Sequence, residues 1–172
     1  MITEHRNNKV TIPPDFFGLL AKQTQNCEEM LVLLSDEKKA LMIMDTSALL
    51  SLSRMKEQQL SLIQALDGTL TKTAENIAQT FDLPAAGLSG LAPHLPPEEA
   101  KKLSRVRKEL LHLQEEILSR NLLNKKFAQE TKNFLGDAIS LITGAMRQDQ
   151  GYTTRGLNRS SKNQPSFISR EV

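Results

Sequence analysis

The chain has few of the residues that favour β-sheets. Its 172 residues include no Trp, one Tyr and one Cys, and aromatic residues make up only 4%. Strands prefer β-branched and aromatic residues, which are scarce here. The apolar 39% consists mostly of Leu, Ile, Ala and Met, which fill seams between helices. These features predict an all-α fold.

Features of secreted, membrane-spanning and strongly charged proteins are also missing. The single cysteine, Cys27, excludes an internal disulfide and favours a reducing compartment. Residues 1–14 lack the apolar stretch of a signal peptide. The longest apolar runs, such as Leu31 to Leu34, fall far short of the roughly 20 residues that a membrane span needs. The formal charge of +2 gives no reason to expect nucleic acid as a partner of the whole chain. We expect a cytoplasmic protein without a membrane span.

Helical periodicity begins after a polar arm, residues 1–14, which ends in two prolines and leaves Asp15 as a candidate N-cap. From Phe16 to about Met44 the apolar residues recur three or four positions apart, or at sums of these steps, which places one stripe on one helix face. Gln23 and the Glu37-Lys38 pair interrupt this stripe. The stripe consists of Phe16, Leu20, Cys27, Met30, Leu34, Leu41 and Met44.

The run Asp45-Thr46-Ser47 predicts a tight turn, with Thr46 or Ser47 capping a second helix. The alternative is one unbroken helix from Phe16 to Leu66, which would need a coiled-coil partner. The second helix carries Leu49, Leu52, Met55, Leu60, Ile63, Leu66 and Leu70. Asp67-Gly68 should weaken the helix, with a restart at Thr71 or Thr73 and a short helix over residues 74–81.

Residues 82–97, with four prolines and two glycines, predict a long connection whose leucines pack over the helix ends. Pro96-Pro97-Glu98-Glu99 is typical of a helix start. A third long helix should run from there to about Met146. Its stripe is Leu103, Val106, Leu110, Leu113, Ile117, Phe127, Phe134, Ala138, Leu141 and Ala145, with Arg120, Asn121 and Asn124 in the gap. Residues 147–172 are polar, without a sustained period, and predict a flexible tail.

Together these elements predict an elongated antiparallel three-helix coiled-coil-like bundle with a short helix and loop insertion. The expected division is a flexible arm over residues 1–14, a helical bundle over residues 15–146, and a flexible, partner-binding tail over residues 147–172.

No residues are spaced for catalysis or for cofactor or metal binding. His5, His94 and His112 have no second ligand at zinc spacing. Cys27 lies on the first stripe with no adjacent cation, so it is expected to be a buried structural thiol. The basic cluster over residues 101–108 lacks aromatic residues for stacking and is flanked by acids, so a solvated helix face is the favoured interpretation. We expect a binding protein, not an enzyme.

The distal part of the third helix is the candidate binding surface. Its apolar residues form more than one narrow stripe, because Leu135, Ile139 and Ile142 lie off the main seam. Two interpretations stay open: a wider core covered by Phe81 and the loop leucines, or an exposed face that takes up a partner helix. The apolar set is Phe127, Phe134, Leu135, Ile139, Leu141, Ile142, Ala145 and Met146.

Two blocks of sequence give a family resemblance, which covers residues 16–156. The first, CEEMLVLLSDEKKALMIMDTSALLSLSRMKEQQLSLI, combines a leucine-rich helix, an EKKAL run, an Asp-containing turn and a second leucine helix with Lys56-Glu57. The second is a final helix bearing Asn121 and Asn124, then a polar stretch, then Tyr152-x-x-x-Gly156. The chain resembles the FlgN-type flagellar export chaperones. The tail beyond Gly156 has no counterpart in the pattern.

The resemblance implies a function. Such chaperones hold hook-associated proteins, the hook–filament junction proteins, in the cytoplasm and deliver them to the flagellar type III export gate. The client would meet residues 127–146 and the tail that follows. Tyr152 and Gly156 would belong to the family's tail motif, for which the export gate is a second expected contact. The sequence allows a monomer or a weak homodimer.

Two rival functions share the coarse features. A generic helical adaptor or coiled-coil protein-binding module would have the same helices, and only the asparagine helix with Tyr152-x-x-x-Gly156 argues against it. A nucleic-acid-associated protein would use the Arg-rich tail, and its binding would fall steeply with salt.

Overall fold

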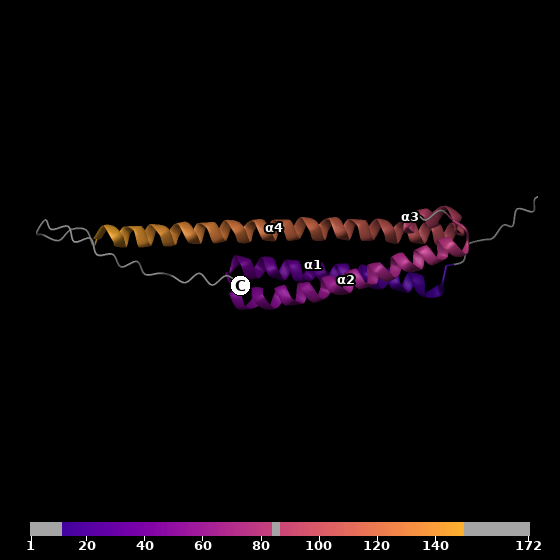
Figure 1. Cartoon of the computed structure of the whole chain (residues 1–172), viewed down its shortest axis with the longest axis horizontal. Helices are drawn as coiled ribbons and strands as arrows, with labels where there is room; N and C mark the ends of the chain where they lie inside the picture. Colours follow the sequence, from indigo (N-terminus) through magenta and orange to yellow (C-terminus); the bar gives the residue numbers. More distant parts are fainter. Residues whose placement is uncertain (1–11, 84–86, 150–172) are drawn as a thin grey trace, which may run out of the picture. The chain divides into compact units, whose positions relative to one another are not determined.

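The structure, a computed structural model, describes residues 12–83 and 87–149, with side chains described through Gly144. The chain divides into two compact units, Met1–Gln129 and Glu130–Val172, and one helix runs through both. The elements are α1 (Pro14–Met42), α2 (Thr46–Thr80), the short α3 (Leu88–Leu91), the 3-10 turn η1 (Ala92–His94) and α4 (Pro97–Asp149). The predicted all-α class, with three long helices and a short helix, is confirmed (Figure 1). The predicted arm and tail boundaries stay predictions.

In the first unit the three long helices run up, down and up. Residues later in α1 contact residues earlier in α2. The Gln23 side chain donates to the Ile63 carbonyl, and the Gln59 side chain donates to the Asn26 carbonyl. Consecutive helices are therefore antiparallel, as predicted. α4 runs in the direction of α1, because its residue Leu103 shares a cluster with Phe16 and its later residue Asn124 bonds Leu34. Figure 1 shows the three helices lying alongside one another.

The hairpin between α1 and α2 is held by backbone bonds on one side and a side-chain cap on the other. The N–H groups of Met44 and Asp45 donate to the carbonyls of Leu41 (3.2 Å) and Ala40 (3.0 Å). This is a Schellman ending, with Met44 in the left-handed region at φ 55°. The Asp45 carboxylate then accepts the N–H of Ala48 at 2.9 Å and caps α2.

The turn was predicted correctly and its cap was not. Thr46 is the first residue of α2, and the Ser47 hydroxyl donates to the Asp45 carboxylate instead of capping the helix. The backbone bond from Ala48, followed by the Ser47 hydroxyl bond, lowers the pKa of Asp45 because both stabilise the charged form. Asp45 accepts both bonds because the Schellman ending leaves it in the N-cap position.

Two further boundaries differ from the prediction. α1 begins at Pro14 with Pro13 in the N-cap position, so Asp15 lies in the first turn, near the positive helix end, and is not the cap. α1 ends at Met42, not at Met44. Its last turn is closed by the Schellman bonds, which require Met44 to leave helical geometry.

The predicted break at Asp67-Gly68 is wrong, because α2 is continuous from Thr46 to Thr80. A glycine inside a helix costs about 1 kcal/mol relative to alanine. Burial of Leu70, Ala74 and Ile77 on the far side of Gly68 outweighs that cost. Thr71 and Thr73 do not start a new helix, because both lie inside α2, and the Thr73 hydroxyl donates to the Thr69 carbonyl.

One hydrophobic cluster joins all the elements of the first unit. Phe16 and Leu20 from α1 and Leu103 from α4 are completely buried in it. The three predicted stripes supply half of its buried members, and the connection after α2, the end of α2 and Ile12 supply the others. The buried members are Ile12, Phe16, Leu20, Cys27, Leu70, Ala74, Ile77, Ala78, Leu91, Leu95, Leu103 and Leu110.

The segment after α2 closes one end of this cluster. α2 ends in a second Schellman arrangement, in which Leu83 N–H donates to the Ala78 carbonyl at 2.8 Å and Asp82 takes φ 52°. The α3–η1 turn follows, with Leu91 fully buried and Leu95 nearly so. The prediction that the leucines of this connection pack over the helix ends is confirmed for Leu83, Leu88, Leu91 and Leu95.

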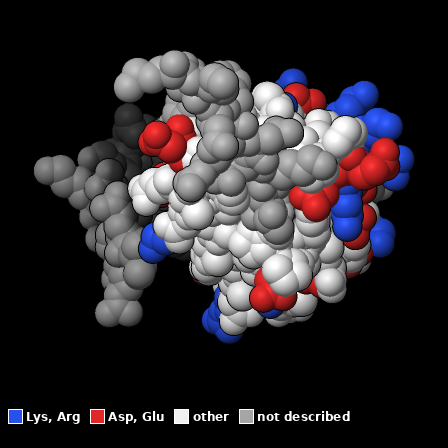
Figure 2. Space-filling view, turned by 90° about the vertical axis from the view of Figure 1, so that its right-hand side faces the viewer, with Lys and Arg blue, Asp and Glu red and all other residues white. Residues whose placement is uncertain are grey.

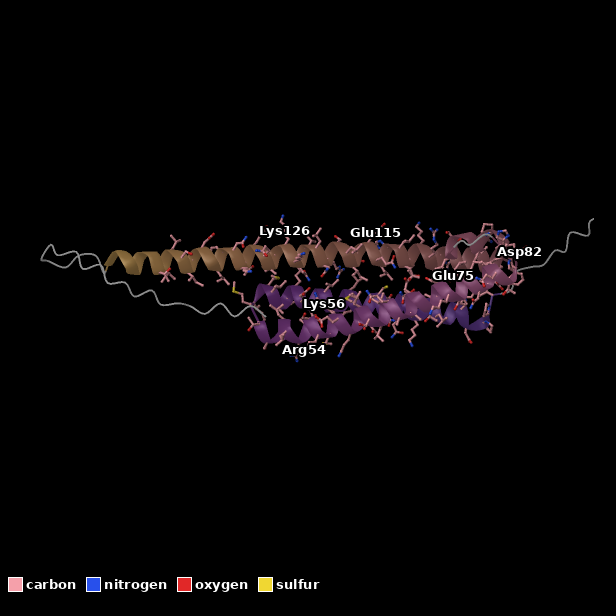
Figure 3. The ribbon with its side chains drawn as sticks, in the orientation of Figure 1. Arg54, Lys56, Glu75, Asp82, Glu115 and Lys126 are labelled. Carbon is pink, nitrogen blue, oxygen red and sulfur yellow. The ribbon has the colours of Figure 1, made fainter. Side chains whose placement is uncertain are left out.

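The polar residues that interrupt the stripes bind across the helix interfaces. The Nε2 of buried Gln59 donates to the Asn26 carbonyl at 2.9 Å and to the Glu29 carboxylate at 3.1 Å. The Nζ of Lys56 lies 2.6 Å from the Glu37 carboxylate. Figure 3 shows Lys56 and Arg54 on opposite sides of α2, with Lys56 on the side of the other helices.

Asn124 completes this layer from α4. It is only 5% exposed, and its Nδ2 donates to the Leu34 carbonyl at 2.8 Å and to the Glu37 carboxylate at 2.9 Å. We call Glu37, Lys56 and Asn124 the polar layer. It ties α1, α2 and α4 at one level, and it explains why α4 carries an asparagine where the periodicity leads us to expect an apolar residue.

We predict that Asn124→Ala lowers the free energy of unfolding by about 1–3 kcal/mol, because it leaves buried polar groups short of a partner. Urea unfolding monitored by circular dichroism measures this. Asn121→Ala is the matched control, since Asn121 is exposed on the same helix; it should stay within about 0.5 kcal/mol of the parent. Equal losses in the two variants would contradict the role of the polar layer.

A second prediction concerns the hairpin. Met44→Gly should raise the free energy of unfolding by roughly 0.5–1 kcal/mol, because glycine adopts the left-handed conformation without a Cβ penalty. Met42→Gly, a change inside α1, should lower it by a similar amount. Thermal or urea unfolding of both variants distinguishes them, and destabilisation by Met44→Gly would show that the Met44 side chain contributes more than the strain costs.

Candidate functional site

The seam of α4 is a row of residues spaced alternately three and four apart. In the first unit it comprises Leu103, Val106, Leu110, Leu113, Ile117, Arg120, Asn124 and Phe127, none of which except Phe127 is classed as exposed. The α1 and α2 helices cover this row through the cluster and the polar layer. The heptad spacing therefore produces a buried interface wherever partner helices are present.

The same row continues in the second unit with Thr131, Phe134, Ala138 and Leu141. Here its large members are exposed: Phe134 is 69% and Leu141 75% accessible. Solvated surfaces of monomeric proteins rarely present contiguous large apolar side chains. An exposed heptad seam is a surface suited to accept a partner helix.

A second apolar row lies beside the seam in this unit. Leu135, Ile139 and Ile142 are 43%, 61% and 58% exposed. We define the distal face of α4 by the residues of the two rows that are large and apolar: Phe134, Leu135, Ile139, Leu141 and Ile142. Sequence reasoning singled out all five.

The other predicted site residues fall elsewhere. Phe127 lies in the first unit, 42% exposed, at the end of the covered part of the seam. Met146 belongs to α4, but its side chain is outside the described set, and Tyr152 and Gly156 lie outside the described residues. The structure therefore leaves the tail part of the predicted site as a prediction.

The structure also bears on the two interpretations of the distal face. Phe81, Leu83 and Leu88 pack against the cluster of the first unit, around Leu91 and Leu103. If the distal residues belonged to a wider core, these are the residues that would have to cover them. All five residues of the distal face are exposed in the described structure.

Charges border the distal face. Glu130 and Asp137 each lie one residue before a seam residue, on one edge of the distal face. Lys132 lies seven residues before Ile139 and therefore on the other edge. These side chains can guide a partner of complementary charge and set its direction. Figure 3 places Glu115 and Lys126, in the first unit, on the side of α4 turned away from α1 and α2. Their charges make that side of the helix polar.

Among the described residues, the other side chains that could act as nucleophiles or metal ligands are not arranged for either role. Cys27 is buried, and burial, followed by the charges of Asp67 and Glu28, raises the pKa of its thiol. The thiol therefore stays protonated and is a poor nucleophile. His94 and His112 are exposed. Within residues 12–83 and 87–149, no three His, Cys, Asp or Glu side chains cluster so that they could hold a metal ion.

The basic cluster over residues 101–108 is part of the fold's surface. Lys101 pairs with Glu98 at 3.4 Å, and the Nζ of Lys102 lies 4.3 Å from the centre of the Phe17 ring. On the face seen in Figure 2, Lys and Arg are intermixed with Asp and Glu. The exposure of Lys101, Lys102, Arg105, Arg107 and Lys108 agrees with the predicted solvated face. In the part of the chain that the structure describes, no helix is long and apolar enough to cross a membrane.

Sequence reasoning missed one surface feature. A shallow groove between α1 and α2 is lined by Val32, Met55 and Leu62, which are 50–60% exposed, with Gln59 at its base. The signal was present, because Val32 and Leu62 fall off the predicted stripes.

Comparison with known proteins agrees with these features. The model of one protein family, described as "FlgN protein", matches residues 14–160. That match takes in α1, α2 and α4, and hence the whole distal face. No curated protein and no solved structure matches the chain. The chain belongs to the FlgN family and is a non-enzymatic flagellar export chaperone for hook-associated proteins.

Proposed function

We propose that the distal face of α4 is the surface that binds the hook-associated client, in the cytoplasm, and that the tail assists delivery to the flagellar export gate. The exposure of Phe134, Leu135, Ile139, Leu141 and Ile142 supports the first part. An amphipathic client helix recognises such a surface through apolar residues three, four and seven positions apart.

The energetics of this face suit a temporary complex. Covering each large apolar side chain contributes about 1.5–3 kcal/mol. Association itself costs about 4–15 kcal/mol in lost freedom, and ordering a client segment adds to that cost. Five such side chains contribute roughly 7–15 kcal/mol, the same order as the cost of association, so we expect a complex weak enough for a competing partner at the export gate to remove the client without a nucleotide.

The cytoplasmic location and the role of the tail rest on sequence. A lone buried thiol and the family assignment support the cytoplasm. The tail motif, Tyr152-x-x-x-Gly156, supports a contact with the client or the gate. For the free chaperone we propose a monomer or a weak homodimer.

We predict that Leu141→Asp and Phe134→Asp each abolish capture of hook-associated proteins while leaving the fold intact. Both side chains are more than two-thirds exposed, so an aspartate costs the free chain little, whereas a buried charge disrupts the complex. Pull-down with purified client and thermal unfolding measure the two effects.

The matched control for these variants is Leu118→Asp, at a 70% exposed leucine of α4 in the first unit. It should bind client normally. A large loss of thermal stability in Leu141→Asp would show that the distal face is core. Normal capture by both distal variants would show that the client binds another surface, with the α1–α2 groove as the next candidate.

A separate prediction tests the tail. Tyr152→Ala and a chain ending at Gln148 should keep the helical content of the parent and should weaken client capture or interaction with the export gate. Circular dichroism, co-purification with client and gate, and a motility assay give the three readouts. Unchanged binding and motility in both forms would contradict a role for the tail motif.

A further inference from the structure

Gln23 interrupts the apolar stripe of α1, and the protein satisfies only one end of its buried amide. The side chain is 2% exposed, and its Nε2 donates to the Ile63 carbonyl of α2 at 3.2 Å. Its Oε1 is buried and accepts no hydrogen bond from the residues that the structure describes. Removing an amide oxygen from water without giving it a donor is destabilising, so buried polar atoms of folded proteins are bonded to the protein or to ordered water.

Gln23 also lines a small cavity in the first unit. The cavity has a volume of about 140 Å³, and its walls come from α1, α2, α3 and α4. One water molecule needs about 10–15 Å³ of such space, so the cavity has room for several. Because the amide nitrogen of Gln23 is already bonded to Ile63, the oxygen is the atom that needs a partner from this cavity.

Three other polar side chains line the cavity. Asp67 comes from α2, whereas Arg107 and Gln114 come from α4, where they lie seven residues apart and so on one side of the helix. Asp67 supplies hydrogen-bond acceptors, and Arg107 and Gln114 supply N–H donors. The remaining wall is apolar and consists of Leu70, Leu88, Leu110 and Leu111.

This mixture of acceptors and donors selects the occupant. A water molecule donates two hydrogen bonds and accepts others, so it can donate to Gln23 Oε1 and to Asp67 while it accepts from Gln114 or Arg107. A simple anion has no hydrogen for Gln23 Oε1 and would be repelled by Asp67. A metal ion would be repelled by Arg107, and the described His, Cys, Asp and Glu residues form no cluster that could hold one.

We propose that this cavity is a structural hydration site, in which ordered water joins Gln23 of α1 to Asp67 of α2 and to Gln114 or Arg107 of α4. Gln23 lies roughly three helical turns before Leu34, the residue that Asn124 bonds. The site therefore links the same three helices at a second level, away from the polar layer, and it explains why a glutamine interrupts the α1 stripe. It concerns how α4 is held against α1 and α2, and it does not depend on where the client binds.

A crystal structure of the full-length chaperone, at a resolution that shows ordered water, tests the proposal directly. We expect a water within hydrogen-bond distance of Gln23 Oε1 and of at least one polar side chain of α2 or α4. In the Gln23→Met variant, which keeps the length of the side chain without its amide, that water should be lost. A dry cavity in the parent, the same water in the variant, or a protein group donating directly to Gln23 Oε1 would overturn the proposal.

Double-mutant cycles test the same link in solution. Residues of one hydrogen-bond network are energetically coupled, whereas residues without a shared partner have additive effects. The effect of Gln23→Met on the equilibrium constant for unfolding in urea should therefore change by about threefold or more in an Asp67→Ala or a Gln114→Ala background.

The matched control for these cycles is Asn121→Ala. Asn121 lies seven residues after Gln114, in the same column of α4, and does not line the cavity. In this background Gln23→Met should have the same effect as in the parent. Additive effects in both cavity backgrounds, or an equal change in the Asn121→Ala background, would contradict the hydration site.

Discussion

The polar layer of Glu37, Lys56 and Asn124 sets the register on which the rest of the first unit depends. Heptad seams of Leu, Ile and Ala can slide past one another by a whole repeat at little cost. A buried asparagine that must meet a particular carbonyl and carboxylate removes that freedom. Glu37 and Lys56 are both largely shielded, and we expect their pair to contribute more to a unique alignment than to stability.

The helices differ in how far they extend beyond the polar layer. α1 ends at Met42, less than two helical turns after Glu37, whereas α4 runs on to Asp149, about seven turns after Asn124. The seam continues unchanged in period over those turns. Among the described residues, α4 therefore carries more seam beyond the polar layer than α1 does, and we propose that the client binds to this part of the seam.

The sequence predicted the elements better than their ends. Apolar spacing was enough to locate three long helices and the hairpin between α1 and α2, because each stripe is long and regular. It failed at Gly68, where burial of residues on both sides outweighs a local propensity. It failed again at Asp45, because the cap depends on the Schellman ending of the preceding helix, which residue types alone do not reveal.

The candidate site was predicted only in part, for a different reason. Periodicity identified the apolar residues from Phe134 to Ile142 but could not say whether another helix covers them. Coverage depends on the relative lengths and register of α1, α2 and α4, which only the fold supplies. Conversely, Asn124 looked like a family marker and proves to be a structural residue, whereas Asn121 is exposed. Tyr152 and Gly156 lie beyond the described residues, so their role in binding stays a prediction from sequence.

The central claim is our proposal that a client helix covers the exposed distal face of α4. Hydrogen exchange of the chaperone's own amides, free and with a saturating hook-associated protein, measures this most directly. We expect amides of residues 103–124 to be protected in both states, and amides of residues 130–143 to exchange quickly in the free chain and slowly in the complex. Strong protection of residues 130–143 in the free chaperone, or no gain on binding client, would contradict the account.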